Sequence, residues 1–132
     1  MTREELIEEA KAAREMAYAP YSHFFVGAAI ETVDGKIYRG CNIENAAYGP
    51  SNCAERTAIF KAVSEGDKRF TQIAIVGGPE GEPISQFCAP CGVCRQVMSE
   101  FCDGETFLIH LSDGKENRTY TLAEILPLAF SL

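Results

Sequence analysis

The 132-residue sequence lacks the features that mark membrane-spanning, exported or nucleic-acid-binding proteins. Its longest mostly apolar run, 24–30, is far too short to span a bilayer. The charged N-terminus has no apolar core of a secretory signal, so we expect a cytoplasmic protein. Lys and Arg total 12 against 19 Asp and Glu, and the resulting net charge of −7 disfavours binding to phosphate backbones. We therefore expect neither a membrane nor a nucleic acid as partner.

Internal repeats, low-complexity segments and a boundary between domains are absent as well. We therefore expect residues 1–132 to form a single domain. Hydrophobic residues make up 46% and charged residues 23%, which is ordinary for a soluble globular protein and argues against disorder. The unusual feature is six cysteines in a short chain: Cys41, Cys53, Cys88, Cys91, Cys94 and Cys102.

The cysteines favour metal binding over disulfides. Thiols stay reduced in the cytosol, and a chain of this length can build a core without covalent cross-links. Cys91 and Cys94 form a C-x-x-C pair, which is typical of metal ligands. Cys88 precedes Cys91 at the same spacing, so a closed structural zinc site with four cysteines stays open as an alternative. Cys41 and Cys102 are expected in the core.

Hydrophobic periodicity and capping residues predict an α/β fold. The expected helices cover 2–17, 53–64, 91–100 and 121–126, and the expected strands cover 25–32, 36–43, 70–77, 106–112 and a short stretch ending near 120. Asn52 is expected to cap the second helix. A hairpin followed by alternating strands and helices predicts one mixed sheet covered by helices, a three-layer α/β/α domain with five strands.

Three of the cysteines lie where two predicted helices begin. Helix N-termini carry positive partial charge, which favours thiolates at Cys53 and Cys91. Cys94 shares a helical face with Cys91 because three residues separate them. Three protein ligands leave the fourth position of tetrahedral zinc open for water, as in catalytic sites. Glu55, two residues after Cys53, is expected beside the metal, where a carboxylate can act as general acid and base.

Four ordered blocks of sequence resemble the small homotetrameric cytidine deaminases. They are 24–29 (FFVGAA), 40–45 (GCNIEN), 53–58 (CAERTA) and 90–96 (PCGVCRQ). The third and fourth blocks match the zinc-deaminase pattern in its variant with three cysteine ligands. The resemblance runs over nearly the whole chain, from the first helix to Phe130.

The resemblance implies a zinc-dependent hydrolytic deamination of cytidine and 2′-deoxycytidine to uridine and 2′-deoxyuridine, with release of ammonia, in pyrimidine salvage. One Zn²⁺ per subunit would be bound by Cys53, Cys91 and Cys94. Glu55 would carry protons, and Arg56 would donate hydrogen bonds to the ligand thiolates. The subunits would form a homotetramer.

The resemblance also implies where a nucleoside binds. Asn42 and Glu44 would bind the sugar hydroxyls, Phe24 would pack on the nucleoside, and the Ala54 backbone would contact the pyrimidine. Ile43 would be a further substrate contact, Tyr48 would help line the pocket between subunits, and Phe130 would reach the pyrimidine in a neighbouring subunit's site. An amide and a carboxylate suit neutral hydroxyl groups, whereas the carboxylate would repel a phosphate. Nucleosides are therefore expected as substrates rather than nucleotides.

Three rival functions stay open from the sequence. They are deamination of another aminopyrimidine such as a nucleoside antibiotic, editing of nucleic acid, and a zinc-stabilised binding module without catalysis. The acidic charge argues against the second and Glu55 against the third. His23 and His110 are expected to have hydrogen-bonded structural roles rather than to bind metal.

Overall fold

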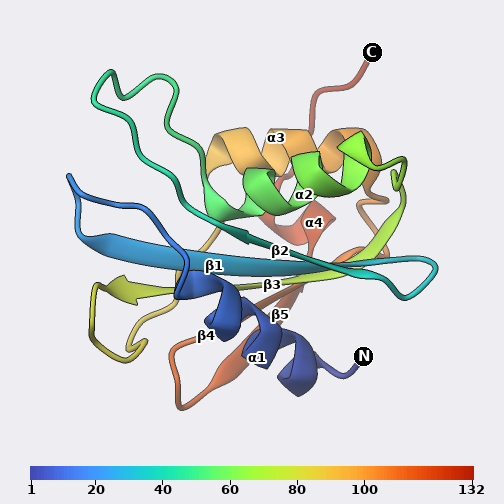
Figure 1. Cartoon of the computed structure of the whole chain (residues 1–132). Coiled ribbons are helices and arrows are strands. Elements are labelled where there is room, and N and C mark those ends of the chain that lie inside the picture. Colours follow the sequence, from blue (N-terminus) through green and yellow to red (C-terminus); the bar gives the residue numbers. More distant parts are fainter.

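The computed structural model describes residues 1–132, and a five-stranded sheet forms its middle layer (Figure 1). The strands are β1 (Phe24–Thr32), β2 (Ile37–Cys41), β3 (Phe70–Pro79), β4 (Leu108–Ser112) and β5 (Asn117–Thr121), in the order β2-β1-β3-β4-β5. The β3–β4 pair is parallel and the other three pairs are antiparallel. The expected mixed sheet of five strands is confirmed.

Helices cover both faces of this sheet. They are α1 (Arg3–Arg14), α2 (Ala54–Ser64), α3 (Gly92–Phe101) and α4 (Leu122–Ile125). Figure 1 shows α1 on one face, and α2 and α3 side by side on the other. The three-layer arrangement expected from the sequence is therefore confirmed.

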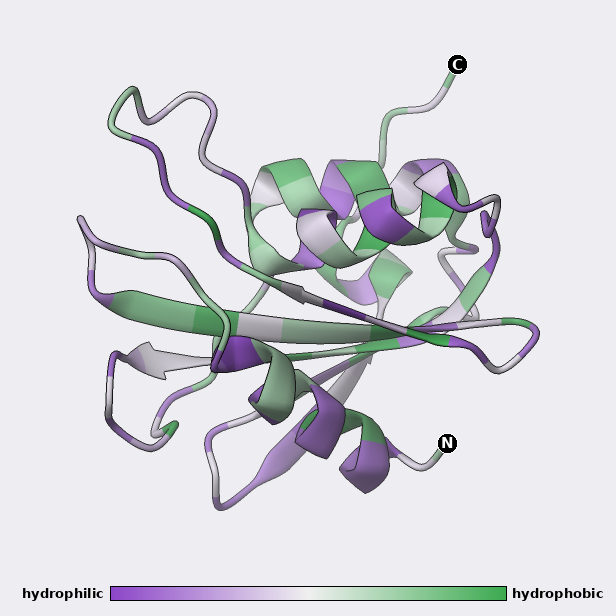
Figure 2. Ribbon diagram, in the orientation of Figure 1, coloured by the Kyte–Doolittle hydropathy of each residue, from purple (hydrophilic) through white to green (hydrophobic).

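Side chains along each central strand alternate between two apolar cores, because successive residues of a strand point to opposite faces. Ala28 and Ile30 of β1 belong to the larger core, under α2 and α3. Ala29, between them, belongs to the smaller core, under α1. In Figure 2 much of β1 is green, as expected for a strand with an apolar core on each face, whereas α1 carries large purple stretches.

Two glycines let the helices approach the sheet closely. The position that a Cβ atom of Gly27 would take lies 2.1 Å from the backbone oxygen of Ala10 in α1. The corresponding position at Gly40 lies 2.4 Å from the backbone oxygen of Ala54 in α2. Any side chain at either position would collide with helix backbone, so only glycine fits.

The first helix is shorter than the expected span of 2–17 and ends at Arg14. Its N-terminus is as expected, with a capping box between Thr2 and Glu5. After the helix, Tyr18 takes part in strand-like pairing: its N–H donates to the oxygen of Asn42, and its own oxygen accepts from the N–H of Glu44. These tertiary hydrogen bonds end the helix before Pro20 does.

The capping role expected for Asn52 is wrong. The N-cap of α2 is Cys53, and it has no side-chain cap hydrogen bond. The backbone of Asn52 pairs instead with Ile43, and its side chain donates to the hydroxyl oxygen of Thr57. At α3 the helix proper begins at Gly92, with Cys91 as the N-cap.

Several strand ends also differ from expectation. Strand β2 stops at Cys41, so Asn42 and Glu44 lie just beyond it. Strand β3 continues to Pro79, and β4 begins only at Leu108. The final turn has the expected capping box, formed by Thr121 and the residue three positions later.

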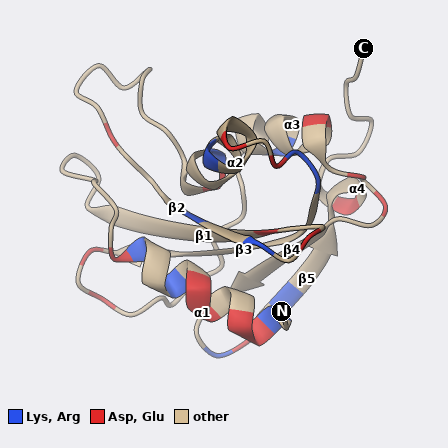
Figure 3. Ribbon diagram, turned by 45° about the vertical axis from the view of Figure 1, so that its right-hand side comes forward, with Lys and Arg blue, Asp and Glu red and all other residues tan.

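Among the Lys, Arg, Asp and Glu residues, only Arg14 and Glu55 are buried. Figure 3 shows many charged residues along α1 and few on the central strands. None of the helices has both the length and the apolar character needed to cross a membrane.

Candidate active site

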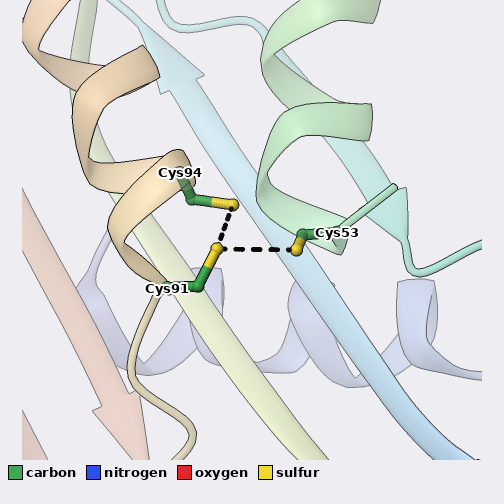
Figure 4. A group of neighbouring side chains, drawn as sticks. All are labelled: Cys53, Cys91 and Cys94. Carbon is green, nitrogen blue, oxygen red and sulfur yellow. Dashed lines mark hydrogen bonds between the residues drawn. The ribbon is translucent and has the colours of Figure 1, made fainter. Parts of the chain in front are cut away.

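The sulfur atoms of three cysteines converge between the starts of two helices. Cys53 is the N-cap of α2, and Cys91 is the N-cap of α3, whose first turn contains Cys94. The Cys53 and Cys91 Sγ atoms are 3.7 Å apart, and those of Cys91 and Cys94 are 3.5 Å apart (Figure 4). The three Sγ atoms all lie within 4.8 Å of one another.

This arrangement fits a zinc ion. With Zn–S bonds of about 2.3 Å, two sulfur ligands of a tetrahedral zinc are about 3.8 Å apart, close to the observed separations. Neither helix has a side-chain cap, so the free N–H groups and the positive end of each helix dipole face this region. Hydrogen bonds from Cys94 and Arg56 lower the pKa of Cys53 to about 5, which favours the thiolate that a metal requires.

Glu55 lies in the first turn of α2, next to the thiol cluster. It is only 4% exposed, and it lines the same cavity as Cys53 and Cys91. Burial raises the pKa of Glu55 to about 7. A carboxyl group with such a pKa can both accept and donate a proton near neutral pH.

Arg56 lies beside the cluster on its α2 side. Its Nη2 donates to the Sγ of Cys53 over 3.2 Å. Its Nε is buried and has no hydrogen-bond partner. Zn²⁺ with three thiolates has a net charge of −1, and this guanidinium would offset that charge.

The cluster opens into a cavity of about 330 Å³, a size typical of small-molecule sites. Among the expected site residues, it is lined by Asn42, Glu44, Cys53, Ala54, Glu55, Arg56 and Cys91. The structure therefore brings together the expected metal ligands, the acid and two polar residues. The two polar residues, Asn42 and Glu44, lie in the segment after β2 rather than in the strand itself.

Asn42 and Glu44 are both held by hydrogen bonds. The Asn42 amide accepts from the N–H of Val26 and donates to the oxygen of Phe24, at 2.9 and 2.8 Å. Glu44 Oε1 accepts from two backbone N–H groups at 21–22, and its Oε2 accepts from the Ser22 hydroxyl. Each side chain keeps unused hydrogen-bonding capacity for a ligand.

Four other expected contacts do not line this cavity. Ile43 is exposed and pairs through its backbone with Asn52. The Phe24 ring and the cavity residue Cys88 both lie close to Gly77. Tyr48 is 74% exposed, in the loop before α2. Phe130 is 66% exposed, in the C-terminal tail, where its backbone oxygen accepts from Gln96 of α3.

All six cysteines are free thiols, so the disulfide interpretation is not borne out. Cys88 lines the cavity but lies outside the three-sulfur cluster, which argues against a closed site with four ligands. Burial raises the pKa of Cys88 to about 11. Cys102 packs against the larger core as expected. Cys41 does not, because it lies at the end of the edge strand β2 and is only partly buried.

The two histidines have the expected structural roles. His110 is buried between Thr119 and Gln72, at 2.8 and 2.7 Å from its two ring nitrogens. His23 is exposed and lies 3.4 Å from Glu80. Neither belongs to the thiol cluster.

Sequence reasoning missed four residues that line the cavity: Val26, Ser51, Asn52 and Ala89. Ser51 and Asn52 directly precede Cys53, and Ala89 lies two residues before Cys91. Their position next to the metal motif could have indicated them. Val26 lies two residues after Phe24, and the period of two along a strand could have indicated it.

Comparison with known proteins agrees with this geometry. Residues 1–110 match the family model described as the cytidine and deoxycytidylate deaminase zinc-binding region. The chain is 54% identical to a cytidine deaminase of Sporosarcina psychrophila, over 99% of this chain and 93% of that protein. It is 35% identical to a blasticidin-S deaminase of Bacillus cereus, over 96% and 91% of the two chains.

A solved structure shows the same fold. The crystal structure of a cytidine deaminase from Burkholderia pseudomallei matches with a TM-score of 0.88 and 50% identity, covering 98% of this chain and all of that one. Sequence family, fold and the three-thiol cluster agree. The chain therefore belongs to the zinc-binding cytidine and deoxycytidylate deaminase family of enzymes.

Proposed function

We propose that this enzyme deaminates cytidine and 2′-deoxycytidine to uridine and 2′-deoxyuridine, releasing ammonia. The observation that carries this proposal is a buried carboxyl, Glu55, on the wall of the same cavity as the three-thiol cluster. A zinc site of purely structural function would be closed by a fourth ligand and would need no acid beside it. Residues 1–132 act as one domain, because both helix layers pack on one sheet.

In this proposal Cys53, Cys91 and Cys94 hold one Zn²⁺ per subunit. When bound, the ion supplies a water of lowered pKa as the nucleophile. Arg56 stabilises the thiolates by its hydrogen bond to Cys53 and by its charge. The starts of α2 and α3 contribute their positive dipole ends.

Glu55 moves the protons. It accepts one proton of the water that attacks C4 of the pyrimidine and delivers it to N3. It then passes the second proton of that water to the amino group. The bond between C4 and this nitrogen breaks, and ammonia leaves while C4 becomes a carbonyl. Each proton transfer lowers the barrier of the step that it accompanies.

We assign recognition of the nucleoside to polar residues that line the same cavity and to residues that flank them. Asn42 and Glu44 bind the sugar hydroxyls with the hydrogen-bonding capacity that their own contacts leave free, with Ile43 between them. Phe24 packs on the nucleoside, and the backbone of Ala54 contacts the pyrimidine. The carboxylate of Glu44 disfavours a phosphate on the sugar, which makes nucleosides the substrates.

The remaining wall of the site comes from other copies of the chain. Tyr48 and Phe130 are large, exposed and outside the cavity of their own chain, so they are available to neighbouring subunits. We assign them to the sites of neighbours in a homotetramer. We also propose that the enzyme acts in the cytoplasm, in pyrimidine salvage.

The test is direct. Cytidine, 2′-deoxycytidine, a cytidine monophosphate, a cytosine-containing oligonucleotide and blasticidin S are each incubated with the zinc-loaded protein, and ammonia release is measured. We expect turnover with the first two and little with the monophosphate and the oligonucleotide. Deamination of blasticidin S or of the oligonucleotide, without activity on either nucleoside, would overturn the proposal.

A further inference from the structure

Arg14 is a buried cation without an acidic partner. It lies in the last turn of α1, is 7% exposed and forms no salt bridge. Buried charges are normally paired, so this one needs another explanation. Its guanidinium instead donates to three backbone oxygens: Nε to Phe25 at 3.0 Å, and Nη2 to Pro79 and Glu82 at 2.8 and 2.9 Å.

Two of the three segments that carry these oxygens also line the cavity, β1 through Val26 and the loop after β3 through Cys88 and Ala89. Phe25 is in β1, Pro79 is the last residue of β3, and Glu82 is in the loop that leads to Cys88. Gly78 leaves room for the guanidinium, because a Cβ atom there would lie 3.2 Å from Nη2. Arg14 therefore ties two strands and a loop together at one point.

Asn42, which follows β2, forms hydrogen bonds to the same stretch of β1. Phe24 and Val26, on either side of Phe25, are the two residues whose backbone the Asn42 amide binds. Three consecutive residues of β1 are thus fixed by two side chains from different elements. Of these residues, Asn42 and Val26 line the cavity.

We propose that Arg14 is a positioning residue for nucleoside binding, which rests on the proposed deaminase function. Its three charge-assisted hydrogen bonds hold residues 24–26 and the start of the 80–91 loop in the geometry that the nucleoside meets. These bonds reach neither α2 nor α3. Arg14 therefore acts on substrate affinity and leaves the thiol cluster and Glu55 in place.

The test compares Arg14→Met, which removes the donors at similar length, with Arg14→Lys, which keeps one charged donor. Arg39→Met serves as the matched control, because Arg39 is exposed and pairs with Glu9 at the surface. For Arg14→Met we expect a rise in KM for cytidine of about tenfold, a kcat within about threefold of the unsubstituted enzyme, and unchanged zinc content. Arg14→Lys should recover part of the affinity, and the control should match the unsubstituted enzyme.

An unchanged KM, or a fall in kcat with unchanged KM, would overturn the proposal and leave Arg14 a purely structural residue. Where Arg14→Met does not fold, the KM of Arg14→Lys decides in the same way. Amide hydrogen exchange gives a readout that needs no activity. Peptides covering 24–26 and 79–88 should exchange faster in the variant while α2 keeps its protection, and a uniform or absent change contradicts the assignment. Failure of the unsubstituted enzyme to deaminate nucleosides would instead refute the proposed function.

Discussion

The Nη2 of Arg56 donates a hydrogen bond to the Sγ of Cys53, the N-cap residue of α2 three positions earlier. The cap position and the first turn of one helix thus place the cation beside the thiolate. The buried Nε of Arg56 has no partner of its own. With zinc bound, the negative charge of the three thiolates would offset the cost of partly burying this cation.

Replacing Arg56 by Gln should weaken the site without dismantling it. Gln can still donate to sulfur but brings no charge, so the negative charge at the thiolates is less well offset. We expect zinc affinity or kcat to fall by roughly 10- to 100-fold, as is usual for residues that hydrogen-bond metal ligands. Competition with a chelator measures the first quantity and steady-state kinetics the second. Full affinity together with full activity would contradict the role.

Glu55→Gln should separate catalysis from metal binding. The amide has nearly the shape of the carboxyl but cannot accept and deliver a proton. We expect kcat to fall by roughly 10² to 10⁴-fold, with zinc content and thermal stability close to those of the unsubstituted enzyme. Elemental analysis and an ammonia assay on the same preparation provide both measurements. Near-normal turnover would remove Glu55 from the mechanism.

Two cysteines in the same cavity wall should behave differently when each is changed to Ala. Cys91 belongs to the three-sulfur cluster, so Cys91→Ala should lose most of the bound zinc. Cys88 lies outside the cluster, so Cys88→Ala should keep about one zinc per chain. Elemental analysis after dialysis distinguishes the two. Zinc loss from both variants would instead indicate a closed site with four cysteine ligands.

Stability should fall in mild acid because of His110. Burial lowers its pKa to about 4, against an ordinary value of 6.5. Below about pH 6.5 the unfolded chain binds a proton at His110, whereas the folded chain does not. The free energy of unfolding therefore decreases as the pH falls from about 6.5 towards about 4. This single residue should lower the free energy of unfolding by about 2 kcal/mol between pH 7 and pH 5.

The control is His110→Gln, which keeps an amide between Thr119 and Gln72 but does not titrate. Urea denaturation of both proteins at the two pH values gives the difference. The thiol cluster also responds to pH, but equally in both proteins. An equal loss of stability in the variant would assign the acid sensitivity to other groups.

The elements and the metal motif were predictable because their signals are local. The core strands β1 and β3 carry apolar runs bounded by turn residues, and the spacing of Cys91 and Cys94 already places both sulfurs on one side of a helix start. Their proximity to Cys53 follows from the layer arrangement, since α2 and α3 pack on the same face of the sheet.

The errors have a common physical cause, which is competition from contacts distant in sequence. The helix α1 ends early because Tyr18 pairs with the segment after β2, and Asn52 fails as a cap because its backbone pairs with Ile43. Arg14 resembles any surface residue in an amphipathic pattern. Its burial depends on three oxygens from segments up to 68 residues away, which no local pattern encodes.

Gly27 and Gly40, where α1 and α2 pack against the sheet, limit which amino-acid substitutions this enzyme tolerates. A scan of every single substitution should find both positions as intolerant as Glu55, though for a different reason. Variants of the glycines should reduce the amount of folded protein in the cell, whereas Glu55 variants should accumulate normally and lack activity. Because the two glycines face helices on opposite sides of one hairpin, neither helix can withdraw to admit a side chain without uncovering its own core.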